Sequence, residues 1–300
     1  MMQVLLSLAL VGDIGPNVGT TGFNFLKVTP TAQEAAMGTA ALGFSDNAFG
    51  IWYNPAGIVE AKMAEAGLSY ISYVAGVQSG ALAYVNPMKD KAFGVGAYYI
   101  NSGAMKRTDD LNTDLGTFSV SYLDINPAFG WQPTKKLSVG AGLKMLYGKI
   151  DSFWALGLAA DLGVKYTLST GLQATFVAHN LGTSLKAFET QADKLPIDFG
   201  FGFGYSPVSR LRLDLEAHQP LDNKFEVRAG AEGWVSQNVC LRAGLTTASG
   251  DLKGGGGSDI LAGLSAGLGF RLKHYELDYA YVPMVLLGNS HRISFRCSFQ

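Results

Sequence analysis

The stretch Phe199-Gly200-Phe201-Gly202-Phe203-Gly204-Tyr205 has an aromatic residue at every odd position and a glycine at every even one. Successive side chains of a β-strand point to opposite faces, so this stretch would present one greasy face and one bare face. In a helix the same rings would be scattered around the whole circumference. The stretch therefore predicts a strand.

Alternation of period two recurs along the chain downstream of about residue 64. It predicts about fourteen strands, centred near residues 69, 82, 96, 122, 142, 160, 175, 201, 214, 229, 243, 265, 278 and 295. The number is even. Each strand and its connection take roughly 17 residues, which fits strands of about 10 residues joined by mixed loops.

The composition is that of a membrane protein without spanning helices. Charged residues make up 16% of the 300 residues, and 38 are glycine, whereas soluble domains carry about 25% charged residues and about 7% glycine. No apolar run approaches the roughly 20 residues that a spanning helix needs. The expected fold is an all-β membrane protein, a transmembrane antiparallel β-barrel of about 14 strands with a short N-terminal helical hatch or plug.

The predicted connections alternate between short turns and longer loops, as in barrels of the outer membrane of Gram-negative-type bacteria. The predicted outer loops include residues 102–116, 181–195, 248–258 and 284–290. The even strand count then places both chain ends on the periplasmic side.

Three regions are expected along the chain. Residues 1–12 resemble the end of a secretory signal but lack a positively charged start, residues 13–63 form the hatch segment, and residues 64–300 form the barrel. A helix is predicted from Thr31 to Phe44, and a second follows a cap at 45–47 and stops at 54–57. The segment would lie inside the barrel or fold across its periplasmic mouth.

Charged residues concentrate on the bare faces of the later strands, and both signs occur on neighbouring strands. We expect them to form ion pairs that fill the lumen and serve as scaffolding more than as a substrate path. The predicted lumen charges are Lys144, Asp161, Lys165, Arg212, Asp214, Glu216, Glu226, Arg228, Glu232, Arg242, Arg271, Glu276, Asp278, Arg292 and Arg296.

No motif predicts an enzyme, a metal site or a cofactor. The GxSxG pattern at 263–267 continues a strand, without the strand-turn-helix of a nucleophile elbow. The glycine run 254–257 lacks the Lys and Ser/Thr of a phosphate-binding loop and predicts an outer loop. The four histidines, His179, His218, His274 and His291, lack ligand spacing. Cys240 and Cys297 are far apart and are expected to be isolated thiols.

Aromatic residues near the predicted strand ends indicate the girdles of a membrane barrel. They are Tyr98, Tyr99, Tyr122, Trp131, Tyr147, Trp154, Tyr166, Tyr205 and Trp234. A net charge of -1 and a pI near 6.4 provide no basic surface for nucleic acid.

The N-terminal region resembles the signature of PorV/PorQ-type proteins, relatives of the FadL long-chain fatty-acid transporters. The resemblance rests on residues 35–38 with Ala41, on 45–48 and 53–57, and on later pieces at 180–182, 195–196, 277–283, 287–288 and 291–294. It implies a fourteen-stranded outer-membrane barrel with an N-terminal hatch. The hatch motif would comprise Met37, Gly38, Asn47, Tyr53, Asn54, Pro55, Ala56 and Gly57.

The resemblance implies two functions. Some family members serve the type IX secretion system, so the first expectation is an accessory or docking protein whose partners are secretion components or exported cargo. The alternative is a FadL-like channel that takes up small hydrophobic compounds; a purely structural membrane protein is a third possibility. A continuous apolar passage to a gap in the wall would favour uptake, whereas a charge-filled lumen blocked by the hatch would favour docking.

Overall fold

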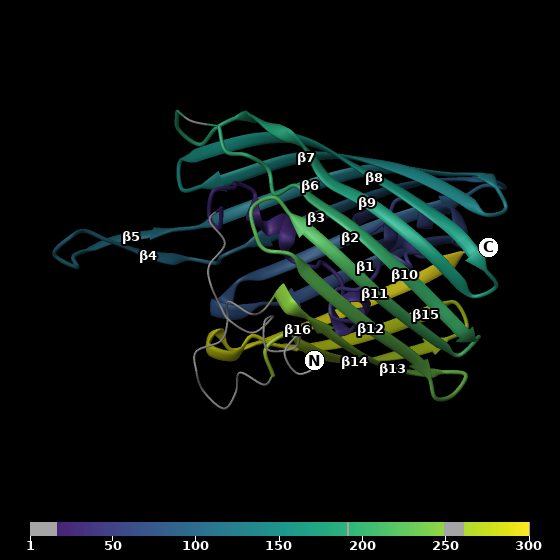
Figure 1. Ribbon diagram of the computed structural model, residues 1–300. Coiled ribbons are helices and arrows are strands. Elements are labelled where there is room, and N and C mark those ends of the chain that lie inside the picture. Colours follow the sequence, from purple (N-terminus) through teal and green to yellow (C-terminus); the bar gives the residue numbers. More distant parts are fainter. Residues whose placement is uncertain (1–16, 191, 249–260, 300) are drawn as a thin grey trace, which may run out of the picture.

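Fourteen antiparallel strands close into a barrel in the computed structural model, which describes residues 17–190, 192–248 and 261–299 (Figure 1). The wall strands are β1 (Ala64–Ser72), β2 (Gln78–Pro87), β3 (Lys91–Asn101), β6 (Val120–Thr134), β7 (Leu137–Ile150), β8 (Phe153–Ser169), β9 (Leu172–Lys186), β10 (Asp198–Val208), β11 (Leu211–Pro220), β12 (Glu226–Trp234), β13 (Val239–Thr246), β14 (Leu264–Leu272), β15 (Tyr275–Pro283) and β16 (Asn289–Phe299). Strand β1 pairs with both β2 and β16, which closes the sheet. The predicted barrel and its strand count are confirmed.

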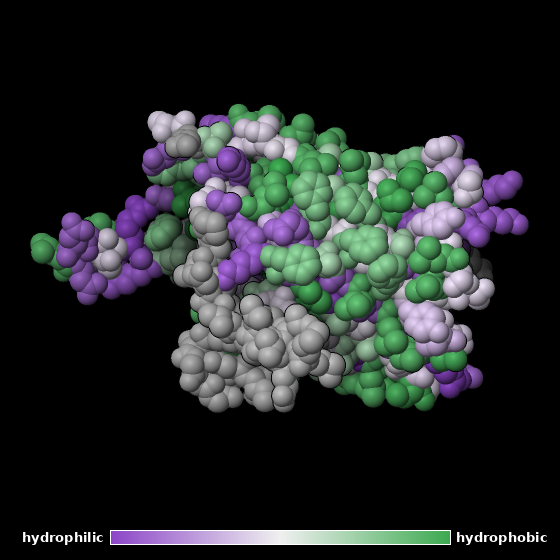
Figure 2. Space-filling view, in the orientation of Figure 1, coloured by the Kyte–Doolittle hydropathy of each residue, from purple (hydrophilic) through white to green (hydrophobic). Residues whose placement is uncertain are grey.

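The two faces of the wall differ as the alternation predicts. Phe201 and Leu213 point outward, and their side chains are 45% and 36% exposed. The next residue in each strand, Gly202 and Asp214 respectively, faces the lumen and is buried. Figure 2 shows hydrophobic residues over the barrel side and hydrophilic ones toward its ends. In the described residues, no helix is long and apolar enough to cross a membrane.

Short turns gather at one end of the barrel and longer loops at the other. The short-turn end carries 88–90, 135–136, 170–171, 209–210, 235–238 and 273–274. The long-loop end carries 73–77, 102–119, 151–152, 187–190 with 192–197, 221–225, 247–248 with 261–263, and 284–288. The connection 151–152 is a tight turn. Strands β4 (Met105–Thr108) and β5 (Asp114–Phe118) pair as a separate hairpin that projects from the long-loop end (Figure 1).

One predicted outer loop is partly wrong. Residues 181–186 of the expected loop 181–195 continue β9 and pair with β8. Asn180 takes a left-handed φ of 58° beside a register shift between Ala160 and Leu162, so a bulge stands where the sequence indicates a turn. The expected loop 248–258 and the glycine run 254–257 fall almost wholly outside the described residues, as does the signal segment 1–12.

The hatch segment, described from residue 17, lies inside the barrel. It contains the short helices η1 (Asn24–Lys27), α2 (Ala32–Ala36), η2 (Ala48–Trp52) and η3 (Gly57–Glu60). None of residues 29–60 is exposed. The helix expected to reach Phe44 stops at Ala36, because Gly38 and Thr39 both adopt positive φ and end it.

The N-terminal part of the hatch segment begins at the long-loop end. The backbone N–H of Gly22 donates to the Lys194 carbonyl, and Lys27 forms an ion pair with Asp222. Residues 194 and 222 lie in the loops after β9 and β11. The chain therefore runs through the lumen from the long-loop end to the start of β1 at the short-turn end. The expectation that both chain ends lie at the short-turn end is wrong for the first described residues, from residue 17 onward.

Candidate functional site

The hatch segment packs against the glycine-rich, lumen-facing surface of the barrel wall. At several wall glycines an added Cβ would come within 3.0 Å of a hatch atom: Gly67, Gly94, Gly96, Gly130, Gly140, Gly163, Gly230, Gly244 and Gly267. At Gly244 the Cβ would lie 1.9 Å from the Gly38 nitrogen. Since real Cβ atoms do not approach so closely, side chains at these positions would push the hatch segment off the wall.

The predicted hatch motif folds onto itself and onto this surface. The Asn47 side chain accepts a hydrogen bond from the Phe49 N–H at 2.8 Å and caps η2 as expected. Asn54 donates to the Leu42 carbonyl and accepts from the Ala56 N–H. The Tyr53 hydroxyl lies 2.6 Å from the Thr31 hydroxyl. These bonds join the two ends of the region between residues 31 and 56.

Gly57 belongs to the expected helix stop at 54–57. In the structure it begins the next helix, η3, with an ordinary φ. An added Cβ would lie 2.0 Å from the Ser45 hydroxyl oxygen, so the glycine is needed for close approach within the hatch segment. Met37 and Ala56 are buried, with Met37 against Gly230 of β12.

Several predicted lumen charges bind the hatch backbone and not only one another. Glu216 accepts from the Leu42 N–H at 2.6 Å, Asp214 accepts from the Gly43 N–H at 3.2 Å, and Lys165 donates to the Gly43 carbonyl at 2.9 Å. These bonds satisfy backbone groups of residues 42–43, which are buried and lie outside helices and strands. The wall charges therefore hold the hatch segment in place.

An ion-pair cluster lies toward the short-turn end. Arg242 contacts Glu232 at 2.8 Å, Glu276 at 3.3 Å and Asp278 at 2.5 Å. Arg296 contacts Glu276 at 2.6 Å and lies near Asp278 and Glu65. In such a cluster each charged group contacts several groups of opposite charge. The free-energy cost of removing each group from water is therefore offset by more than one ion pair.

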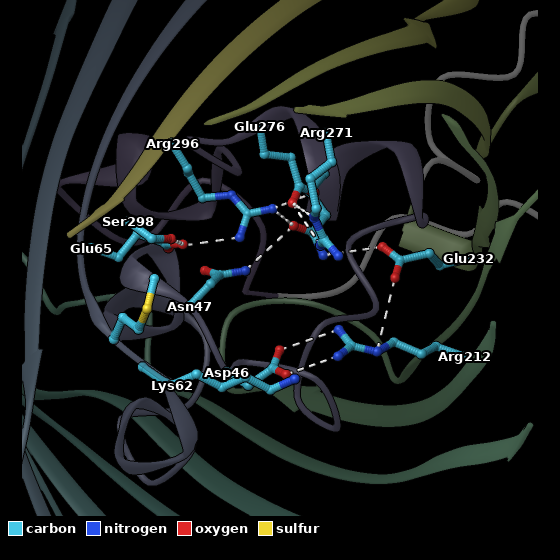
Figure 3. A pocket seen from close by; sticks show the side chains of 13 residues that line it. Asp46, Asn47, Lys62, Glu65, Arg212, Glu232, Arg271, Glu276, Arg296 and Ser298 are labelled. Carbon is cyan, nitrogen blue, oxygen red and sulfur yellow. Dashed lines mark hydrogen bonds and ion pairs between the residues drawn. The ribbon is translucent and has the colours of Figure 1, made fainter. Parts of the chain in front are cut away.

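Beside this cluster a polar pocket of about 260 Å³ opens at the short-turn end (Figure 3). Arg212 reaches across it to Asp46 of the hatch segment at 2.8 Å. Burial alone would raise the pKa of Asp46, but the positive charges of Arg212, Lys165 and Arg296 together outweigh burial and hold that pKa at about 2. Arg271 stacks over Trp234 and is half exposed at the rim.

The remaining predicted charges form separate groups. Lys144 pairs with Asp161 at 2.7 Å, and Arg228 pairs with Glu226 at 2.9 Å. Arg292 has no carboxylate partner among the described residues; one of its N–H groups donates to the Thr29 carbonyl at 2.5 Å. The fifteen residues therefore do not converge on a single site.

An aromatic cluster occupies the lumen toward the long-loop end. Phe25 of η1 stacks on Tyr122 at a centroid distance of 5.1 Å and 9° between planes, and on Tyr98 at 5.7 Å. Phe23 and Phe188 meet Tyr122 edge-on. We call these five residues the aromatic cluster. It brings together a wall surface from β3 and β6, a loop residue and two rings of the hatch segment.

The structure corrects three girdle assignments. Three of the expected girdle residues face the lumen: Tyr98, Tyr122 and Trp234. Each lies two residues from a buried residue of the same strand, namely Ile100, Asp124 and Glu232, and therefore on the same face. The other expected girdle residues lie on the outer face. The sequence contained the signal for Tyr98: adjacent Tyr98 and Tyr99 cannot both face lipid.

Other sequence features are placed as follows. Ser265 of the GxSxG pattern accepts from the Gly38 N–H and donates to the Ala36 carbonyl, so it anchors the hatch segment. His218 lies between Asp198 and Glu216. No metal-binding group of His, Cys, Asp or Glu occurs in the described residues. Cys240 faces the lumen and Cys297 the outer surface, so they cannot pair.

Solved structures match the chain over nearly its whole length, although no protein-family model and no curated protein matches it. The "CymD monoaromatic hydrocarbon channel" matches with a TM-score of 0.67 at 15% identity, covering 93% of this chain and 99% of that one. The Pseudomonas putida toluene transporter TodX matches with a TM-score of 0.63 at 14% identity, covering 90% and 98%. A Pseudomonas aeruginosa FadL homologue matches with a TM-score of 0.59 at 13% identity, covering 97% and 100%.

This chain has the FadL-like barrel fold. A FadL-like fold comprises a fourteen-stranded barrel and a short N-terminal region of helix and 3-10 turns, and both are present here. Two of these neighbours are described as a monoaromatic hydrocarbon channel and a toluene transporter. In this FadL-like barrel, the aromatic cluster and the seated hatch segment are the candidate functional site.

Proposed function

We propose that the protein lies in the outer membrane as a FadL-like channel that admits small hydrophobic compounds from the long-loop end. The observation that carries the proposal is the stack of Phe25 on Tyr122 and Tyr98. The wall supplies two flat rings, and the third ring comes from a short N-terminal segment of the same chain. A small aromatic compound has the shape and polarity to take the place of that third ring.

The proposal predicts opposite effects for two substitutions in the same stack. Tyr122→Ala removes a wall ring and should weaken toluene binding roughly 3- to 10-fold. Phe25→Ala removes the competing ring and leaves an apolar space of the kind that binds benzene-sized molecules, so it should strengthen toluene binding. Tyr147→Ala on the outer face, where Tyr147 is 37% exposed, is the matched control.

Binding is measured on the purified full-length protein in detergent by saturation-transfer NMR with toluene. Uptake of labelled toluene by a bacterial host that carries each variant in its outer membrane gives the functional readout. A folded wild-type protein that neither binds nor admits toluene would refute the channel proposal. Equal losses in Tyr122→Ala and Tyr147→Ala would remove the aromatic cluster from it.

A second candidate is the PorV-type role in type IX-like protein secretion or surface assembly. It is favoured by the interior, in which none of residues 29–60 is exposed and ion pairs line the wall. By this proposal the barrel is a docking platform for exported proteins, with the projecting β4–β5 hairpin at its outer end. Recovery of secretion components with the native protein from detergent-solubilised outer membranes would support it, and recovery of the barrel alone would count against it.

A further inference from the structure

Arg292 differs from every other cation of the predicted lumen set. Each of the others has a carboxylate within 4.0 Å: Lys144, Lys165, Arg212, Arg228, Arg242, Arg271 and Arg296. Arg292 has no carboxylate within this distance in the described part of the chain. It is nevertheless buried, with only 5% of its surface exposed. A buried charge without a counter-charge is costly, so its retention calls for a reason.

The donors of Arg292 are only partly used. One N–H group donates to the Thr29 carbonyl at 2.5 Å, and another reaches the Ser290 hydroxyl at 3.4 Å. A guanidinium carries five N–H donors in a planar fork that matches a carboxylate. Both of its acceptors are neutral, so the positive charge of Arg292 is not balanced locally.

Two further polar groups lie on the same part of the wall. The hydroxyls of Ser79 and Tyr98 are buried and face each other, and within the residues that the structure describes neither has a further hydrogen-bond partner. Ile71 of β1 pairs with Arg292 on one side and with Ser79 on the other. Adjacent strands lie about 4.8 Å apart, so Arg292 and Ser79 are roughly 10 Å apart along the wall, on either side of the buried Ile71 side chain.

Tyr98 connects this polar group to the aromatic cluster. Its ring stacks on Phe25, while its hydroxyl lies beside the Ser79 hydroxyl. The hatch segment covers both parts, with the Phe25 ring in the stack and the Thr29 carbonyl on the guanidinium. One short stretch of the chain therefore presents an aromatic ring and an acceptor oxygen to the wall.

We propose that Arg292, Ser79 and Tyr98 form an anion-binding subsite beside the aromatic cluster, and that the ligand class is aromatic carboxylates. The carboxylate would lie on Arg292 in place of the Thr29 carbonyl, and the ring would lie on Tyr122 in place of Phe25. This inference rests on the proposed channel function and narrows its substrate class from neutral hydrocarbons to organic acids.

Two probes with the same apolar body separate the inference from the function on which it rests. The full-length protein in detergent is titrated with 4-ethylbenzoate and with ethylbenzene at fixed, low ionic strength. Arg292→Gln should weaken binding of the acid at least 10-fold and leave the hydrocarbon within about 2-fold, because charge-assisted hydrogen bonds are the strong ones. Arg292→Lys should recover much of the acid binding.

Arg210→Gln is the matched control, since Arg210 is exposed in the turn between β10 and β11. Tyr98→Phe removes a hydroxyl and keeps the ring; it serves as the test if Arg292→Gln does not fold. It should weaken binding of the acid about 3-fold more than it weakens binding of the hydrocarbon.

Equal effects of Arg292→Gln on both probes, or no effect on either, would show that Arg292 only anchors the hatch segment and would overturn the inference. The same holds for Tyr98→Phe where it is the variant used. A wild-type protein that binds ethylbenzene but not the acid overturns the inference and leaves the channel proposal standing. A wild-type protein that binds neither overturns both.

Discussion

Gly140 of β7 lies directly beneath Pro55 of the hatch segment, so closely that an added Cβ would come within 2.3 Å of the Pro55 carbonyl carbon. The same Cβ would lie 2.4 Å from the Ala56 nitrogen. The contact is backbone against backbone, and no side-chain rotation can relieve it. The segment 54–57 is therefore fitted to one point of the wall and does not only end a helix.

Gly140→Ala should destabilise the folded protein by about 1 to 3 kcal/mol through overpacking. Gly233→Ala is the matched control, because a Cβ at Gly233 meets no atom within 4 Å. Thermal unfolding in detergent, followed by the mobility shift of the folded barrel on gels, compares the two variants. Equal stability of the two would mean that the hatch segment is not pressed against β7.

The outer face gives a second prediction. Leu213 of β11 faces outward, while Arg212 beside it faces the lumen and pairs with Asp46. Leu213→Arg should cost about 2 to 4 kcal/mol if Leu213 lies near the bilayer midplane. Refolding into lipid vesicles with a urea titration measures the cost, with Leu213→Ala as control. If refolding tolerates both variants equally, the lipid face is wrongly assigned.

The ion-pair cluster gives a third prediction. Arg242→Met leaves Glu232 and Asp278 without their shared partner and should cost about 3 to 5 kcal/mol. Arg271→Met removes an arginine whose side chain is 48% exposed at the rim, and it should cost less than about 1 kcal/mol. The same urea titration tests both. A small cost for Arg242→Met would mean that water or a neighbouring cation replaces the lost charge.

Membrane orientation gives a fourth prediction. Thr108 of the projecting hairpin and Lys135 of a short turn are both exposed at opposite ends of the barrel. On intact cells a membrane-impermeant maleimide should label Thr108→Cys, and Lys135→Cys should be labelled only after the outer membrane is opened. The wild-type protein, with buried Cys240 and half-buried Cys297, gives the background. Labelling in the reverse order would invert the barrel.

Strand positions and wall faces could be predicted from the sequence because a period of two is a local signal. Alternation assigns Phe201 and Arg212 to opposite faces without knowledge of any partner. It fails where the backbone departs from the pleat, as at Asn180, whose bulge extends β9 through an expected loop. At Tyr122 the residue type was misleading: a tyrosine near a strand end indicates a girdle. Alternation would have placed it in the lumen, because it lies two residues from lumen-facing Asp124.

The candidate site could be predicted only in part. The glycines of the lumen-facing surface indicated that the wall has few large side chains on that side. They did not indicate that residues 36–58 pack against it, because that contact joins positions far apart in the sequence. Charge patterning located Glu216 and Lys165, yet their partners are hatch backbone groups that no residue type reveals. Phe25 is an unremarkable residue in the sequence and gains its role only from the stack on Tyr122.

The central claim is that the hatch segment closes a barrel whose wall is otherwise a pore. Planar-bilayer conductance of the full-length protein and of a variant that lacks residues 31–57 tests it most directly. We predict that the full-length barrel is silent to ions and that the deletion variant inserts and conducts, because the wall glycines then face water. A deletion variant that inserts normally and stays silent would show that the ion-paired side chains close the lumen by themselves and would contradict the account.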